Sequence, residues 1–597
     1  MLQAIKEVGE QKLKREGRDI FDILSIIVED SNVDGKCPKV LVAVFKKKRR
    51  DVLYAYTQIE DNSKEKISKY LYCRGASQGP NYSPTAKITE LEKTFRNKIE
   101  SWFKKYKSSN ELIKGLKSAI ETSREKILKD LSDKLNNIKP SLKRNQVCLF
   151  TLAIEENGEI KYLGDYQAFK DLLINSVKKD YRQIMQVKHI CSVCGEVKDE
   201  VYGDAIPFAF YTLDKPGYIA GGFYKENAWK NAPACLECIL KIKEGKKFLD
   251  EKLKSKMGGQ QYYLIPKFIL GVKGIEEIID TFFDYFEHRN DLLSQRTLKR
   301  ISEDEKEILE ELGKLKDVLT YNFLFFRADN PQVFRINLIV EDILPSRVSA
   351  IFEAKKRAEN KEIFRNVKVK KNKYDNVEFR FDILKQFIPS TKTFFEIIDK
   401  TFRGITIDKN LLFSLFLNRI RQSFISEAYL KPLVIQAFVS FLFFKELGIL
   451  PKNEDFKNGG EVMSELKEKA EGFFKDFSDT FYTPAHKAVF LLGVLAQKLL
   501  NIQFSERGST PFRKNLKGLK MKEEDFKSLL TKIQNKLEEY KKNYYRSLET
   551  LISEYFVEAG RNWNFSTDEL NFYFVLGMNL EDFMDKILNL TKEEAQK

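Results

Sequence analysis

The sequence predicts an α+β protein, in which a mixed α/β N-terminal region with an inserted four-cysteine zinc module precedes an all-helical C-terminal bundle. Three observations support this class. Short β-patterned segments alternate with helical segments over roughly the first 390 residues. Two C-x-x-C pairs, 40 residues apart, interrupt that alternation. From about residue 391 onward, Phe and Leu recur at three- and four-residue steps, which is the period of a helix.

The first elements follow from local pattern. A helix is expected from the start to about Arg18, and a β-hairpin from the strands at 40–45 and 51–59. The apolar and aromatic run at 67–73 predicts a third strand. An apolar stripe among lysines predicts helices over 88–140.

Later elements are read in the same way. Residues 262–270 are strand-like, and 321–343 read as a second hairpin that turns at Asp329, Asn330 and Pro331. The charged stretch 273–319 predicts solvated helices. The break at 451–460 reads as a linker within the helical part.

A chain of 597 residues is long enough for several domains. Its composition, 43% hydrophobic and 32% charged, is that of a globular protein. The changes of pattern predict four parts: an N-terminal α/β domain at 1–185, the cysteine module at 186–250, a second α/β part at 251–390 and a helical domain at 391–597.

Lys and Arg (103) outnumber Asp and Glu (87), which gives a net charge of +16. This excess favours polyanionic partners, with nucleic acid first and an acidic membrane surface second. The best candidate for a membrane span, 433–444, is too short and contains polar residues, so we expect no membrane partner. The N-terminus has no apolar signal segment, so a reducing, cytoplasmic location is expected.

The cysteine pairs are Cys191 with Cys194 and Cys235 with Cys238. Two such turns supply the four soft ligands of a tetrahedral Zn²⁺. Buried or disulfide-bonded thiols are the alternative, but seven cysteines is an odd number and a reducing compartment disfavours disulfides. Four thiolates leave no open coordination position, so the zinc is expected to be structural.

Several catalytic signatures are absent from the sequence. It contains no G-x-x-x-x-G-K-[ST] phosphate loop, no G-x-S-x-G elbow and no His-Asp pair. We therefore expect a binding scaffold and no enzyme. Two alternatives stay open: a zinc-ribbon nucleic-acid-processing enzyme with carboxylate metal ligands, and a zinc-ribbon transcription or RNA-binding factor.

Four segments resemble a known family. They are CSVCGE (191–196), VYGDAIPFAFYTLDKPGYIAGGF (201–223), AWKNAPACLECILKIKEGKKFL (228–249) and GASQGPNYSPTAKIT (75–89). Together with the order of the predicted parts, they resemble the large subunit of type I-B CRISPR surveillance complexes (Cascade).

The resemblance implies a role in antiviral defence. Such a subunit holds the 5′ handle end of the guide CRISPR RNA, reads a protospacer-adjacent motif (PAM) in target duplex DNA and starts R-loop formation. Its helical part would line the path of the displaced strand. The implied protein partners are the Cascade backbone and handle-binding subunits, a small helical subunit and a recruited helicase-nuclease.

The turn-rich loop between the first strands and the first long helices is the candidate PAM reader. Its glycines permit close backbone approach to a groove, and its amide and hydroxyl groups can bond base edges. An ordinary surface turn has the same composition, so that reading stays open. The candidate residues are Gly75, Gln78, Gly79, Asn81, Tyr82 and Ser83.

Three basic groups are candidates for phosphate contacts. For the first hairpin tip, the alternative is a charged hairpin end that protects solubility. For the two arginines, it is cationic side chains that lie along an exposed face of their helix. The residues are Lys46, Lys47, Lys48, Arg49 and Arg50 at the first hairpin tip, Lys368, Lys370, Lys371 and Lys373 in a later stretch, and Arg419 and Arg421 in an apolar helix.

A second translation start is possible at Met463, which follows two adjacent glycines and two further residues. Two glycine codons can spell a strong ribosome-binding site, so residues 463–597 could form a separately translated small subunit. The resemblance implies such a product in related complexes. A flexible linker with a routine internal methionine is the alternative.

Overall fold

The computed structural model forms two compact units. The first comprises residues 1–253 with the short strand segments 265–267 and 328–335, and the second comprises the rest. The residues that the structure describes are 1–48, 51–75, 79–106, 108–181, 185–209, 222, 224–269, 275–293, 318–330, 333–370, 373–451 and 464–590. The four-part division at 185, 250 and 390 stays a prediction.

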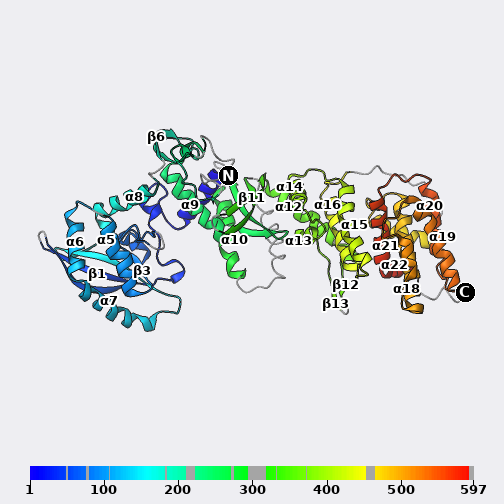
Figure 1. The fold of residues 1–597 in the computed structure, drawn as a ribbon, viewed down its shortest axis with the longest axis horizontal. Coiled ribbons are helices and arrows are strands. Elements are labelled where there is room, and N and C mark those ends of the chain that lie inside the picture. The colour runs from blue at the N-terminus through cyan, green and yellow to red at the C-terminus, as the bar shows by residue number, and fades with distance from the viewer. Residues whose placement is uncertain are drawn as a thin grey trace. The chain divides into compact units, whose positions relative to one another are not determined.

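A five-stranded sheet forms the centre of the first unit, with the order β2-β1-β4-β3 and with β5 beside β4 (Figure 1). Strand β1 pairs antiparallel with β2 and parallel with β4. The predicted hairpin at 40–59 is therefore confirmed, and β1 continues through its lysines to the turn. The strands are β1 (Lys39–Lys48), β2 (Asp51–Asp61), β3 (Ala86–Ile88), β4 (Cys148–Glu156) and β5 (Glu159–Tyr162).

Helices α6 and α7 cover β2, where Tyr54 donates to Asp130 of α7 over 2.7 Å. Val40, Val42 and Val44 of β1 belong to a buried cluster with Tyr70 and other aromatic and aliphatic residues. The helices of this unit are α1 (Leu2–Arg15), α2 (Ile23–Ile27), α3 (Ile67–Tyr70), α4 (Leu91–Thr94), α5 (Ser101–Lys105), α6 (Glu111–Thr122), α7 (Arg124–Ile138), α8 (Gln167–Tyr181) and α9 (Leu236–Glu251).

The third strand predicted at 67–73 is wrong. Residues Ile67–Tyr70 form the short helix α3, which ends at Leu71 in the left-handed conformation (φ 51°). Tyr70 and Tyr72 pack against the sheet, so their aromatic character reflects packing on the sheet and not pairing within it. The helices predicted over 88–140 are confirmed, with Trp102 buried and a π-helical turn at Phe95–Glu100 between α4 and α5.

Helices α1 and α9 approach closely through two glycines. A Cβ on Gly9 would lie 1.9 Å from the Lys241 carbonyl oxygen, and one on Gly245 would lie 2.0 Å from the Ile5 carbonyl oxygen. Only glycine permits backbones to approach this closely. The predicted N-terminal helix therefore packs directly against the backbone of the helix that carries the second cysteine pair.

A four-stranded sheet, ordered β11-β10-β9-β8, opens the second unit. It confirms the strand predicted at 262–270 and the hairpin at 321–343. Aromatic side chains cover it, and Phe323 of β10 lies 4.6 Å from Phe402 of α14. The strands are β8 (Lys254–Met257), β9 (Gln260–Phe268), β10 (Leu319–Asn330) and β11 (Val333–Ile343).

From Thr391 on, every element that the structure describes is helical, as predicted. One described helix, α18 (Pro484–Arg507), is long and apolar enough to cross a membrane, but 72% of its apolar window is buried inside the protein. The helices of this unit are α10 (Ile275–Leu293), α12 (Pro345–Glu359), α13 (Phe381–Lys385), α14 (Thr391–Arg403), α15 (Lys409–Ile425), α16 (Lys431–Glu446), α17 (Glu465–Asp476), α18, α19 (Glu523–Glu539), α20 (Arg546–Ala559), α21 (Thr567–Asn579) and α22 (Glu581–Leu588).

Candidate metal centre and nucleic-acid contacts

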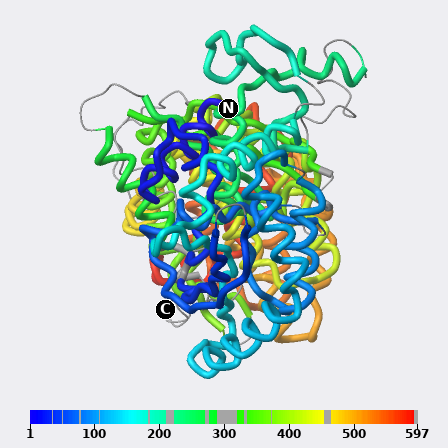
Figure 2. The backbone as a smooth tube through the Cα atoms, turned by 90° about the vertical axis from the view of Figure 1, so that its left-hand side faces the viewer, coloured from blue at the N-terminus to red at the C-terminus, as the bar shows by residue number. Residues whose placement is uncertain are grey.

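A short hairpin and a helix N-terminus bring the four cysteines together. Strands β6 (Met185–Ile190) and β7 (Val197–Tyr202) flank the turn that carries Cys191 and Cys194. Both Figure 1 and Figure 2 show this hairpin at the periphery of its unit. Cys235 occupies the N-cap position of α9, and Cys238 lies in the first turn of this helix.

Backbone bonds fix the two cysteine turns relative to each other. The Ser192 amide donates to the Pro233 carbonyl over 2.7 Å, and Tyr202 and Ala234 exchange two backbone bonds. Gly195 follows the first cysteine pair and has a φ of 76°, a backbone conformation that only glycine adopts readily. The Cys235 amide points at the Cys191 Sγ, 3.3 Å away.

The thiol site fits a tetrahedral zinc ion. The four sulfur atoms lie within 4.8 Å of one another, and Cys191, Cys235 and Cys238 are buried. Four Zn–S bonds of about 2.3 Å place the sulfurs about 3.8 Å apart, so a contraction of about 1 Å completes the site. The positive end of α9 also favours thiolates at Cys235 and Cys238.

The electrostatics of the thiols point to a cation. Hydrogen bonds from the Cys235 and Cys238 thiols lower the pKa of Cys191 well below its usual range. The same bond to Cys191 raises the pKa of Cys235 to about 12, and it raises the pKa of Cys238 as well. Without a metal only Cys191 is favoured as the thiolate, and Cys235 and Cys238 would ionise as ligands only with a positive ion between the sulfurs. The site can hold a metal, and it leaves no ligand position for a substrate.

The candidate PAM loop is fixed from inside by two of its own polar residues. Asn81 is 4% exposed; its Oδ1 accepts from the Gly75 amide (3.3 Å) and its Nδ2 donates to the Thr85 carbonyl (2.8 Å). Ser83 is also buried and donates to the Leu71 carbonyl over 2.5 Å. These side chains hold the loop in shape and do not face solvent.

Other residues of this loop are better placed for contact. Gly79 lies where a Cβ would meet no atom within 4 Å, and its carbonyl accepts from Lys98. Tyr82 is half-buried; its hydroxyl donates to Asp180 and its carbonyl accepts from the Trp102 indole over 3.0 Å. Gln78 lies outside the described residues. The role of the loop in PAM reading stays a prediction.

The lysines of the first hairpin tip are exposed. Lys46 pairs with Glu155 over 3.2 Å, and Lys47 pairs with Glu156 over 2.9 Å. Lys48 stands opposite Asp51 across the hairpin. Arg49 and Arg50 lie outside the described residues. The described lysines of this tip are thus exposed cations with acidic neighbours.

The second basic stretch is itself a hairpin, formed by β12 (Val367–Lys370) and β13 (Lys373–Asp375). Lys368, Lys370 and Lys373 are exposed, and Lys370 faces Lys373 across it. Lys371 lies outside the described residues. Lys368, Lys370 and Lys373 thus lie on one hairpin, which is compatible with a phosphate contact.

The two arginines of α15 have different surroundings. Arg419 is exposed and donates to Ser423 of its own helix over 3.2 Å. Arg421 has a side chain only 12% exposed; it donates to the Leu519 carbonyl (2.8 Å) and to Asp568 (2.6 Å). Arg421 is therefore committed to internal bonds, and Arg419 is the better placed of the two for contact with a partner.

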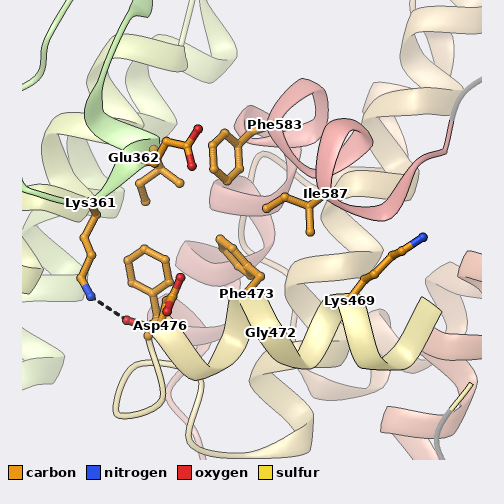
Figure 3. Close-up of a pocket in the computed structure, with 10 residues that line it drawn as sticks. Lys361, Glu362, Lys469, Gly472, Phe473, Asp476, Phe583 and Ile587 are labelled. Atoms are coloured by element: carbon orange, nitrogen blue, oxygen red, sulfur yellow. Dashed lines mark hydrogen bonds between the residues drawn. The ribbon is translucent and has the colours of Figure 1, made fainter. Parts of the chain in front are cut away.

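Met463 lies outside the described residues, but the helices after it are not a separate body. Phe572 of α21 packs on Phe413 of α15 at 5.1 Å, and Lys409 of α15 reaches Glu569 at 3.2 Å. α17 and α22 also line a pocket of about 280 Å³ with the segment around Ile363 (Figure 3). At its edge, Lys361 donates to the Asp476 carbonyl over 2.8 Å.

One basic group escaped the sequence reading. Lys514, Lys517, Lys520 and Lys522 precede α19 and alternate with buried apolar residues. The spacing of these lysines is visible in the sequence, but the internal side chains that fix their loop, among them Arg421, are not.

Fold and site together define the class of protein: a two-unit α+β protein with a four-thiol site that could hold a metal ion and with several exposed basic turns. Models of the CRISPR-associated protein TM1802 family match it in order, with the N-terminal domain at 1–175, the central domain at 188–343 and the C-terminal domain at 379–592. The chain belongs to the CRISPR-associated TM1802 family. Among curated proteins, no sequence match was found.

Proposed function

We propose that the protein is the non-catalytic large subunit of a type I-B CRISPR surveillance complex that works in the cytoplasm. It binds the 5′ handle end of the guide RNA, recognises the PAM in duplex DNA, promotes R-loop formation and helps to recruit the helicase-nuclease. The family match over all three domains carries this proposal. The net charge of +16 and the structural thiol site, which we take as zinc, are consistent with it.

The decisive experiment is reconstitution with guide RNA and the other complex subunits. The complex should bind PAM-bearing duplex more tightly than PAM-free duplex, and this preference should be lost when the large subunit is left out. Equal binding with and without this chain would contradict the proposal. Mg²⁺-dependent cleavage by the purified chain would instead favour the carboxylate-metal enzyme.

Within that assay, Gln78→Ala tests PAM reading by the loop, because a glutamine amide can hydrogen-bond base edges. Gln3→Ala, at an exposed position of α1, is the matched control. We expect Gln78→Ala to reduce the PAM preference and to leave guide-RNA binding unchanged. Unchanged preference in Gln78→Ala would remove that residue from the mechanism. Asn81→Ala is unsuitable as a test, because it removes a bond that holds the loop.

The internal start is a separate part of the proposal. Recoding Met463 to Leu should abolish a C-terminal fragment that begins there. A fragment of the same size that persists in the recoded gene would contradict it. In the full chain, α15 covers the face of α21 that carries Phe572. A separate fragment would expose this apolar face, so a partner would have to cover it.

A further inference from the structure

Residues 511–522, here called the lysine loop, connect α18 to α19. The loop starts with the 3₁₀ helix Pro511–Leu516 and ends where α19 begins. Its apolar side chains are buried and its lysines are exposed, in alternation along the chain. The buried residues are Phe512, Leu516, Leu519 and Met521, and the exposed lysines are Lys514, Lys517, Lys520 and Lys522.

Three polar side chains from three helices fix the backbone of the lysine loop. Gln503 of α18, 1% exposed, accepts from the Phe512 amide over 2.9 Å. Asn571 of α21, fully buried, bonds both the amide (3.2 Å) and the carbonyl (2.7 Å) of Met521. Arg421 of α15 donates to the Leu519 carbonyl. A connecting segment is seldom held so completely, since loops usually satisfy their backbone with water.

The turn at the centre of the loop is also strained. Lys517, Gly518 and Leu519 all have positive φ, at 46°, 61° and 62°. For the two residues that carry a Cβ, such a conformation is unfavourable, and it persists only where the surroundings over-determine it. The buried Leu519 side chain and the Arg421 bond supply that constraint.

Most acidic side chains near the loop are already engaged, whereas Glu524 in the first turn of α19 is exposed and has no ion-pair partner among the described residues. Asp568 pairs with Arg421, Glu523 pairs with Lys527 over 2.5 Å, and Asp525 pairs with Lys517 over 2.6 Å. In the described part of the chain, no carboxylate lies within ion-pair distance of Lys514, Lys520 or Lys522. Three lysines are thus held outward without a counterion from the protein.

The loop surface suits phosphates better than a protein partner. No large hydrophobic side chain is exposed in residues 511–522, whereas the buried centre of a protein interface is apolar and depleted in lysine. Ammonium groups on a fixed backbone suit a regular row of phosphates, because the loop loses little conformational entropy when it binds. We propose that the lysine loop binds the phosphodiester backbone of a single nucleic-acid strand.

This proposal rests on the proposed function, in which a DNA strand is displaced, but the same chemistry would hold single-stranded RNA. The test therefore measures binding of the full-length protein to oligothymidylate and to oligouridylate, each over a range of salt. The loop variant combines Lys514→Gln, Lys520→Gln and Lys522→Gln. The control variant removes the same charge from exposed helix positions of the same unit, with Lys356→Gln, Lys392→Gln and Lys475→Gln.

Each phosphate contact on a single strand contributes about 0.7 to the slope of log affinity against log salt, so the loop variant should lose about 2 in slope. Between about 50 and 200 mM salt, the wild type should then lose roughly 15- to 20-fold more affinity than the loop variant does. The control variant should keep the wild-type slope. A loss on only one oligonucleotide identifies the strand as DNA or RNA.

Equal slopes in the loop and control variants would overturn the proposal, because only the net charge would then matter. So would unchanged strand binding combined with loss of another subunit from the complex, which would make the loop a protein contact. If the wild type binds neither oligonucleotide, the lysine loop proposal fails. The proposed function fails with it only if the assembled complex also shows no PAM preference.

Discussion

Helices α18 and α21 cross through facing glycines, and the crossing should not tolerate a methyl group. A Cβ on Gly493 would lie 2.0 Å from the Phe574 carbonyl oxygen, and one on Gly577 would lie 1.9 Å from the Phe490 carbonyl oxygen. Real Cβ atoms essentially never approach closer than 3.0 Å. Both obstacles are helix backbone, so Gly577→Ala must push the helices apart by about 1 Å.

Helix propensity acts in the opposite direction, and the two effects can be compared. In a helix interior, Gly→Ala ordinarily stabilises by about 1 kcal/mol. Overpacking usually costs about 1–3 kcal/mol and occasionally more, and the contact here is with backbone that cannot rotate away. Taking the overpacking cost at its upper end, about 3 kcal/mol, and subtracting the propensity gain of about 1 kcal/mol, we expect Gly577→Ala to lower the free energy of unfolding by about 2 kcal/mol. Gly472→Ala on α17, where a Cβ meets no atom within 4 Å, should instead raise it.

Thermal unfolding, followed by the circular dichroism signal of the helices, distinguishes the expected loss of stability in Gly577→Ala from the expected gain in Gly472→Ala. Gly577→Ala should lower the melting temperature by several degrees, and Gly472→Ala should raise it slightly. The double variant Gly493→Ala/Gly577→Ala should lose less stability than the sum of the losses in the two single variants, because the first methyl group already separates the helices. A stabilising Gly577→Ala would refute the close crossing.

Three further predictions follow from single residues. Arg421→Met should destabilise by about 2–4 kcal/mol in urea unfolding, because it leaves Asp568 without its partner, whereas Arg419→Met should be near neutral. Burial lowers the pKa of Lys445 to about 8 from a usual value of 10.5, so the folded protein loses this proton while the unfolded chain keeps it. The stability of the wild type relative to Lys445→Met should therefore rise between pH 8 and 10.5, and a difference that is flat with pH would count against this burial. Cys191→Ser should abolish zinc binding, measured as metal content of the purified protein, and should lower the unfolding midpoint of the first unit while the second unit is spared.

How far the sequence predicts this fold depends on how local each signal is. Both long hairpins, the N-terminal helix and the helical half follow from alternation and period, which act between neighbours in the chain. The parallel pairing of β1 with β4, which joins Val40 to Leu149, has no such local signal and emerges only from packing. The false strand at 67–73 shows the converse: its tyrosines have β propensity, but they are used to cover the sheet.

For the sites, the sequence predicts ligand type well and the direction of a side chain poorly. The four cysteines were identifiable because thiolate pairs have few uses besides metal in a reducing compartment. Asn81, Ser83 and Arg421 are polar residues in plausible positions, yet each bonds a backbone group inside the protein. Sequence cannot separate a side chain that contacts DNA from one that holds the loop presenting such contacts.

That distinction decides which variants are informative about recognition. Replacing a residue that holds a loop, such as Asn81 or Arg421, changes the shape of the whole loop and lowers nucleic-acid binding whether or not the residue touches a strand. Replacing an outward residue, such as Lys520, removes one contact and leaves the backbone bonds intact. A salt slope that falls in the lysine variants, together with one that is kept in Arg421→Met, which removes the charge, would therefore assign recognition to the lysines and support to the arginine.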